Sequence, residues 1–234
     1  MNPALPPGPW AVPAEVLGAL LVVRSAAAVV RAPAVTQVAR LGLASGWQVR
    51  RLLGRVADRT LPGRLVRAGA LTSYMVEGVR LPPVYGVGPP AVWPPWDGLS
   101  AVNQVVANNF LMRLLPLGPV RGYAVWSAYG CGLQVFWNDQ CFKVLSFREG
   151  RGEENRFEEF MRLYRPSDGK IVVIAAGVRH MERLSDVAGR RAWPVRLTWD
   201  GALHHLPLAR AFCRVGQYGP VPVTVSGLDE GRLD

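Results

Sequence analysis

The sequence predicts an α+β protein in two parts: a helical N-terminal part that ends in a β-hairpin, and a C-terminal part in the order α-β-β-β-α-β. Three observations predict this class. Apolar residues recur at helical spacing before residue 70, and they alternate or form short buried runs after residue 120. A stretch rich in proline and tryptophan separates the two regions. A chain of 234 residues is long enough for two domains.

Positive charge is concentrated in the first part of the chain. The formal net charge is +10, and nearly all of the positive charge is arginine. Residues 1–95 hold ten arginines and three acids, a balance of +7, whereas the longer remainder holds 17 basic and 14 acidic residues, a balance of +3. A codon bias adds arginine everywhere but does not remove acids from one half. The asymmetry therefore indicates an anionic partner for the N-terminal part.

The N-terminal part divides into a proline-rich arm, residues 1–13, which we expect to be extended, and a domain over residues 14–87. Apolar spacing predicts three helices in this domain, followed by one further helical turn that ends at a glycine C-cap and by two strands. The helices are expected from Ala14 to about Ala32, from Val35 to Leu41 and from Trp47 to about Arg55, the helical turn over Leu65–Leu71, and the strands over about Leu71–Met75 and Arg80–Tyr85. Gly42-Leu43 makes a tight turn before the third helix, and Glu77-Gly78 joins the two strands.

This order of helices, turn and hairpin is that of a winged helix-turn-helix, in which one helix enters the major groove of DNA. We expect the third helix to be the reading helix, with Ser45 as its N-cap and as one of the DNA-binding residues. Gln48 and Arg51, with Trp47 beside them, are placed to reach base edges, since glutamine can pair with adenine and arginine with guanine. Arg50, Arg55 and Arg80 are expected to contact phosphates. The alternative is an ordinary helical bundle with a solvated arginine face.

Residues 88–98 form a linker, and residues 99–226 form the second domain. Its elements are expected at Leu99–Leu115 (helix), Tyr123–Ser127, Gly132–Trp137 and Cys141–Phe147 (strands), Glu153–Tyr164 (helix), Ile171–Ile174 (strand), Met181–Val187 (helix) and Val195–Thr198 (strand). The second and third strands form a hairpin around Asn138-Asp139. We expect this domain to mediate homodimerisation or to contact another protein.

The segments from Pro33 to Ser45 and from Arg64 to Leu71 resemble the winged helix of MarR-like regulators, and more closely that of the replication-relaxation family of plasmids and mobile elements. One departure is an apparent insertion, Val56–Gly63, between the reading helix and the next helical turn. Proteins of that family often continue into a small α/β domain similar to restriction-endonuclease folds, and the α-β-β-β-α-β order matches this weakly. The resemblance implies a role in replication, mobilisation or its regulation.

A nuclease of that fold would need acids on two adjacent strands, because hard cations prefer carboxylate oxygens. The expected strands offer Gln134 and Lys143 but no acid, so we predict a degenerate domain with no catalytic residue, no metal and no cofactor. A displaced site built from Asp139, Glu149 and Glu153 is the enzymatic alternative. The expected function is thus a double-stranded DNA-binding protein that is not an enzyme. A transcription regulator, or a basic scaffold protein of a viral particle, is also compatible with the sequence.

The expected location is the cytoplasm. The three cysteines lack metal-ligand or disulfide-framework spacing, and the N-terminus does not resemble a signal peptide. The most apolar segment, Val16–Val35, contains Arg24 and Arg31, so we expect no membrane span.

Overall fold

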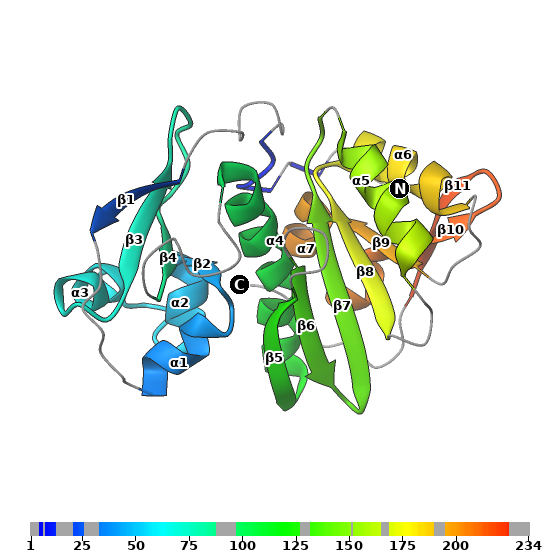
Figure 1. Cartoon of the computed structure of the whole chain (residues 1–234). Coiled ribbons are helices and arrows are strands. Elements are labelled where there is room, and N and C mark those ends of the chain that lie inside the picture. The colour runs from blue at the N-terminus through cyan, green and yellow to red at the C-terminus, as the bar shows by residue number, and fades with distance from the viewer. Residues whose placement is uncertain are drawn as a thin grey trace.

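The structure is a computed structural model that describes residues 5, 6, 8–12, 21–25, 33–87, 97–126, 132–150, 152–164, 169–189 and 195–224. It is a mixed α+β fold with a four-stranded and a seven-stranded sheet. The long helix α4, Gly98–Leu114, lies between the two sheets (Figure 1). Among the described residues, no helix is both long enough and apolar enough to cross a membrane.

The smaller unit contains three short helices and the four-stranded antiparallel sheet. Its elements are β1 (Leu21–Ser25), α1 (Pro33–Ala39), β2 (Leu43–Ser45), α2 (Gly46–Leu52), α3 (Leu61–Arg67), β3 (Thr72–Val76) and β4 (Val84–Gly86). The strand order is β1-β3-β4-β2, so that β2, between the first two helices, pairs with the last strand of the unit. The hairpin β3–β4 follows α3 directly.

Local sequence signals explain most of these boundaries. Ser45 caps α2 in a capping box: its hydroxyl accepts from the Gln48 backbone N–H, and the Gln48 side chain accepts from the Ser45 N–H. Gly42 and Gly69 have positive φ of 71° and 70°, a conformation that glycine adopts readily, and they end α1 and α3. The predicted cap, tight turn and helix stop are therefore confirmed.

Two expectations for this unit change. The predicted helix from Ala14 is wrong over residues 21–25, which form a strand paired with β3; residues 13–20 and 26–32 lie outside the described residues. The run Leu21-Val22-Val23 is apolar at each position, so its spacing does not distinguish helix from strand. The apparent insertion Val56–Gly63 divides into a turn and the first residues of α3, and α2 ends earlier than expected, at Leu52.

The larger unit is built on the seven-stranded sheet in the order β11-β10-β9-β8-β7-β6-β5. After α4 its elements are η2 (Leu115–Leu117), β5 (Val120–Trp126), β6 (Gly132–Trp137), β7 (Gln140–Phe147), α5 (Glu153–Leu163), β8 (Lys170–Ala175), α6 (Val178–Gly189), β9 (Val195–Trp199), α7 (Asp200–His205), η4 (Leu208–Arg210), β10 (Phe212–Gly216) and β11 (Gly219–Val223). β7, β8 and β9 are parallel, and the other neighbours are antiparallel. The elements from α4 to β9 occur in the expected order, whereas α7, β10 and β11 were not predicted.

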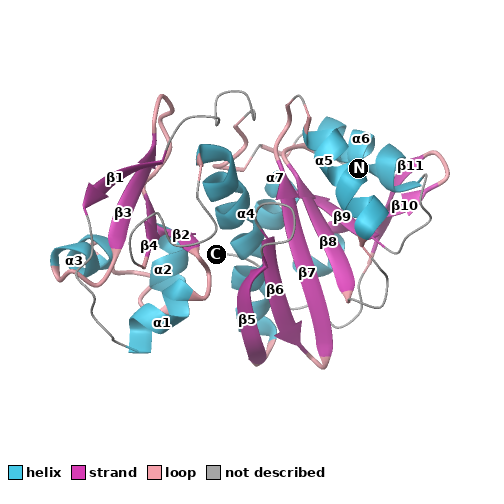
Figure 2. Ribbon diagram, in the orientation of Figure 1, coloured by secondary structure: helices cyan, strands magenta, loops and turns pink. Residues whose placement is uncertain are grey.

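Helices cover both faces of this sheet (Figure 2). Phe142 of β7 packs against Phe110 of α4, with ring centroids 5.6 Å apart. Phe147 has the opposite parity on the same strand and packs against Phe157 of α5 at 5.3 Å. α4 and α7 therefore lie on one face, which we call the α4 face, and α5 and α6 lie on the other.

The two units share one hydrophobic core. α4 packs on β6 and β7 of the larger sheet and also on β2 and α2 of the smaller unit. The predicted linker, residues 88–98, ends inside this helix, because Asp97 is its N-cap and Gly98 its first residue; residues 88–96 lie outside the described residues.

The N-terminal arm is partly built into the core. Residues 8–12, which we call the N-terminal strap, lie against the larger unit, and Trp10 is only 4% exposed. The Trp10 carbonyl accepts a hydrogen bond of 3.2 Å from Arg148, 138 residues later. The arm thus connects the start of the chain to the far sheet; residues 1–4, 7 and 13 lie outside the described residues.

Candidate nucleic-acid interface

The exposed side of α3 presents two arginines. Arg64 and Arg67 are one helical turn apart and both exposed, whereas Pro62 on the same helix is buried and Leu65 is half-buried. The apolar residues hold the short helix against the unit, and this spacing places both guanidinium groups on the outer side. α3 therefore offers two cations to solvent.

Further exposed arginines occur before α3 and in the connection between β3 and β4. Arg55 and Arg59, in the turn before α3, are exposed, and so is Arg80, after the turn between β3 and β4. Residues 33–87 contain eight arginines, no lysine and two acids, Asp58 and Glu77. The surface of this unit is strongly positive, and arginine suits it to phosphate because its guanidinium can bind two oxygens at once.

One of the two acids, Asp58, binds residues at the start of α3. The Asp58 carboxylate accepts hydrogen bonds from the Thr60 hydroxyl at 2.8 Å and the Thr60 backbone N–H at 3.1 Å, and it pairs with Arg64. The Thr60 hydroxyl, with Arg64 also contributing, lowers the pKa of Asp58 below its ordinary value. The carboxylate therefore neutralises part of the charge of Arg64 in the free protein.

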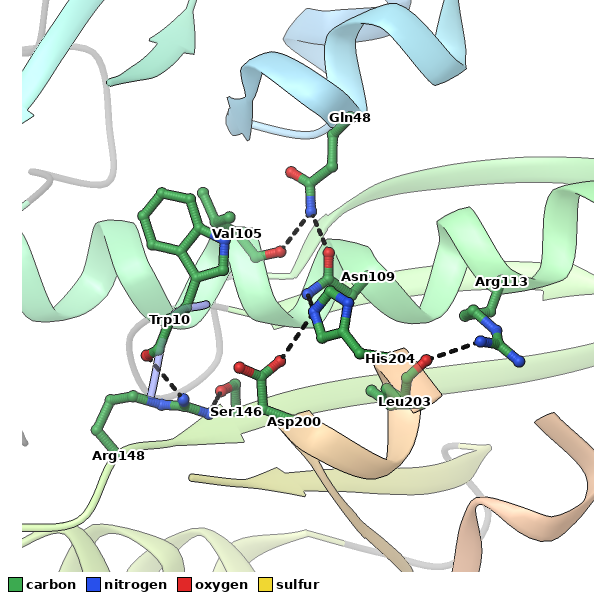
Figure 3. Close-up of polar contacts among 10 residues, drawn as sticks. All are labelled: Trp10, Gln48, Val105, Asn109, Arg113, Ser146, Arg148, Asp200, Leu203 and His204. Carbon is green, nitrogen blue, oxygen red and sulfur yellow. Dashed lines mark hydrogen bonds and ion pairs between the residues drawn. The ribbon is translucent and has the colours of Figure 1, made fainter. Parts of the chain in front are cut away.

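Gln48, expected to read a base edge, lies in the interior (Figure 3). Its side-chain nitrogen donates to the carbonyl of Val105 and to Oδ1 of Asn109, both at 2.7 Å and both on α4. The side chain is 0% exposed, so it has no free donor or acceptor for a base. The prediction that Gln48 contacts DNA is wrong for this conformation, because a polar group on α4 satisfies it instead.

The other predicted contacts on α2 are also engaged within the protein. Ser45 is 8% exposed and serves as the helix cap. Arg50 donates to the carbonyls of Gly46 and Val56, and Arg51 lies over the half-buried Trp47 ring and donates to the Met112 carbonyl at 3.4 Å. α2 therefore faces α4, and of the predicted contacts Arg55 and Arg80 are the two that are exposed.

Three further exposed arginines of this unit, Arg59, Arg64 and Arg67, were not among the contacts expected from the sequence. The sequence did contain one signal for these residues, the position of Leu65–Gly69 directly before the hairpin. A helix next to the hairpin is the one that would be exposed together with the hairpin. The insertion Val56–Gly63 hid this signal, since it contains the first turn of α3.

Behind α2, the buried side of α4 is unusually polar. Asn108 donates to the carbonyls of Leu41 and Leu43, and Arg113 donates to those of Leu203 and Leu206. Burial, with Arg51 nearby, lowers the pKa of Arg113 to about 10. These bonds join α4 to the segment that leads into β2 and to α7.

The same network continues to the carboxyl ends of the parallel strands. The Asn109 amide nitrogen lies 3.4 Å from Nε2 of His204, which lies 3.6 Å from the Asp200 carboxylate (Figure 3). Arg148, next to the end of β7, is fully buried and donates to Ser146 and to Trp10 of the strap. Burial lowers the pKa of Arg148, and nearby Asp200 and Glu153 partly oppose this effect.

The acids proposed for a displaced nuclease site are not brought together. Asp139 precedes β7 and pairs with exposed Arg121, whereas Glu149 follows β7 and pairs with Arg183. Ten residues of extended chain separate them by about 30 Å. Glu153 is buried and pairs with Arg156. Among the described residues there is no group of three histidine, cysteine, aspartate or glutamate side chains placed to hold a metal ion.

Comparisons with protein-family models, with curated proteins and with solved structures found no match to this chain.

Proposed function

We propose that this chain binds double-stranded DNA through a winged helix-turn-helix in which α3, rather than α2, enters the major groove. The observation that supports this most directly is the exposed pair Arg64 and Arg67 on the helix that precedes the hairpin. In a helix-turn-helix the second helix reads the groove and the first supports it. α2 fits the supporting role, because its polar side chains bind α4.

The contacts divide by their chemistry. Arg64 or Arg67 supplies the base contact, since arginine can bind both O6 and N7 of guanine. Arg55, Arg59 and Arg80 contact phosphates on either side, and Asp58 releases Arg64 when DNA supplies a stronger anion. The protein acts by recruitment without catalysis, and the resemblance to replication-relaxation proteins extends the proposal to replication or mobilisation of a plasmid or mobile element. Dimerisation or partner binding by the larger unit stays a prediction.

Fluorescence anisotropy with a labelled duplex tests the proposal. We expect the affinity of the wild-type chain to fall with salt with a log–log slope of about −4 to −5, for roughly five neutralised phosphates. The double variant Arg64→Ala/Arg67→Ala should bind at least about tenfold more weakly, with a slope about two units shallower. A matched control is Arg162→Ala/Arg179→Ala, two exposed arginines on α5 and α6.

Selection of bound sequences from a random duplex pool then tests α3 against α2. Arg67→Ala should relax the preference at one position, whereas Gln48→Ala, measured below its unfolding temperature, should leave the preferred sequence unchanged. A changed motif in Gln48→Ala would restore α2 as the reading helix. Equal binding of all sequences by the wild-type chain would favour a basic scaffold protein.

A further inference from the structure

The strands of the larger sheet contain cations but no acids. None of the seven strands includes aspartate or glutamate, although they include Arg121, Lys143, Lys170, Arg196 and Arg214. Three of these cations, Lys170, Arg196 and Arg214, are exposed and lie on the neighbouring strands β8, β9 and β10. We call these three residues the basic sheet face.

The register places all three side chains on the α4 face. Lys170 is paired with Phe142, which packs against α4, and its ammonium lies 6.0 Å from the Phe142 ring. Arg214 is two residues from Phe212, whose ring also packs against Phe110 of α4. Arg196 is the direct cross-strand partner of Arg214, so it shares that face.

Their charges are not neutralised within the described part of the chain. Arg196 and Arg214 face each other on adjacent antiparallel strands, an arrangement that like charges make unfavourable. Neither forms an ion pair with a described residue, and the hydrogen bond of Lys170 is to the neutral amide of Gln140. The next residue in the row, Val221 of β11, is apolar and 40% exposed. A bound polyanion would relieve this repulsion.

The strands of this face and α3 lie on opposite sides of α4. In Figure 1, α3 is at the extreme left, and β8, β9 and β10 lie to the right of α4. A short duplex seated on α3 is therefore far from the basic sheet face, and the phosphates that reach this face belong to another DNA segment.

We propose that the basic sheet face binds the phosphate backbone of a second duplex, so that one molecule joins two DNA segments. The proposal rests on the proposed function of α3 for the first segment. Binding at the sheet face has no sequence preference, because three exposed cations on the surface of a sheet contact phosphates and not base edges. About three neutralised phosphates give this second contact a salt slope near −3.

A two-duplex capture assay tests the proposal. A short biotinylated duplex on beads retains the full chain, and a fluorescent duplex of different sequence is then added at low salt. The wild-type chain should capture the second duplex. The variant Arg196→Ser/Arg214→Ser should remain on the beads but capture about tenfold less, whereas the control Arg162→Ser/Arg179→Ser should capture as the wild-type chain does.

A second variant separates a loss of binding from a loss of folding. Arg196→Glu places an acid opposite Arg214, so its melting temperature should equal or exceed that of the wild-type chain while capture of the second duplex falls. Undiminished capture by both sheet variants would overturn the inference and assign bridging to a dimer that uses two copies of α3. Two other results would also overturn it. One is a footprint on one long duplex that is shorter for a sheet variant than for the wild-type chain. The other is binding of anionic vesicles by the sheet face in preference to DNA. Failure of the wild-type chain to remain on the beads would instead refute the proposed function of α3.

Discussion

At the scale of single residues, one amide holds α2 against α4. The Gln48 nitrogen makes two buried hydrogen bonds across this contact, and its oxygen completes the capping box of α2. Truncation leaves the Ser45 backbone N–H and Asn109 Oδ1 without this partner and removes the second hydrogen bond of the Val105 carbonyl. We expect Gln48→Ala to lower the free energy of unfolding by about 2–4 kcal/mol. Chemical denaturation measures this.

Gln37 provides the matched control, because its side chain is exposed on α1. Gln37→Ala should change the free energy of unfolding by less than about 0.5 kcal/mol. Equal effects of the two substitutions would show that Gln48 is not buried in solution.

His180 makes stability depend on pH. Burial, together with Arg148, lowers its pKa from 6.5 to about 4. Below the ordinary value the unfolded chain binds a proton that the folded chain does not bind until the pH approaches 4. Stability from this group is therefore complete above about 6.5 and is lost as the pH falls toward 4, by up to about 3 kcal/mol.

The comparison of wild type with His180→Asn isolates this contribution, because the asparagine oxygen can still accept from the Ala176 N–H that Nδ1 accepts from. Between pH 7 and pH 5 the wild-type chain should lose more stability than the variant. Parallel losses in the two proteins would mean that His180 is protonated in the folded state.

At the scale of elements, the sequence predicted helices, strands and turns well where neighbouring residues alone determine the local structure. The Ser45 cap, the turn at Asn138-Asp139, where both residues have positive φ, and the alternation in Gly132–Trp137 each determine structure within a few residues. β1 was missed because its conformation depends on a distant partner. β1 is a strand because it pairs with β3, some fifty residues later along the chain.

Sequence reasoning placed the DNA contacts on α2, whereas in the structure most polar side chains of that helix bind other parts of the protein. On α2, polar residues alternate with apolar ones at helical spacing, which is the pattern of an exposed face. The partners of Gln48 are on α4, 57 and 61 residues away, and no local pattern reveals them. The excess of arginine over acid in this unit does not depend on the helix boundaries, so composition alone is enough to predict its positive charge.

The N-terminal strap behaves as an element of the larger unit. Trp10 is buried in the shared core, so Trp10→Ala should cost about 3–5 kcal/mol of stability. Tyr218→Ala is the control, because this aromatic ring is 94% exposed. Thermal unfolding measures both. A melting temperature unchanged by Trp10→Ala would place the strap outside the core.

At the scale of the whole molecule, the shared core predicts cooperative unfolding. Calorimetry of the wild-type chain should show one transition, although the chain has two sheets, because α4 packs on both. Hydrogen exchange adds a sharper measurement: Gln48→Ala should lower the protection of β3 and of β8 together. Two separate transitions, or a loss of protection confined to β3, would show that the units unfold independently.

The N-terminal strap can dock only after its partners later in the chain have been synthesised. Trp10 leaves the ribosome early, but Arg148, which holds its carbonyl, and Asp200, whose carboxylate lies where a Cβ on Gly8 would stand, are made much later. At about 5–20 residues per second, translation from residue 10 to residue 200 takes roughly 10–40 s. During this time the indole has no place to dock, so the nascent chain displays it to solvent and to any chaperone that binds aromatic groups. The strap is therefore made well before its partners and is among the last segments to reach its final position.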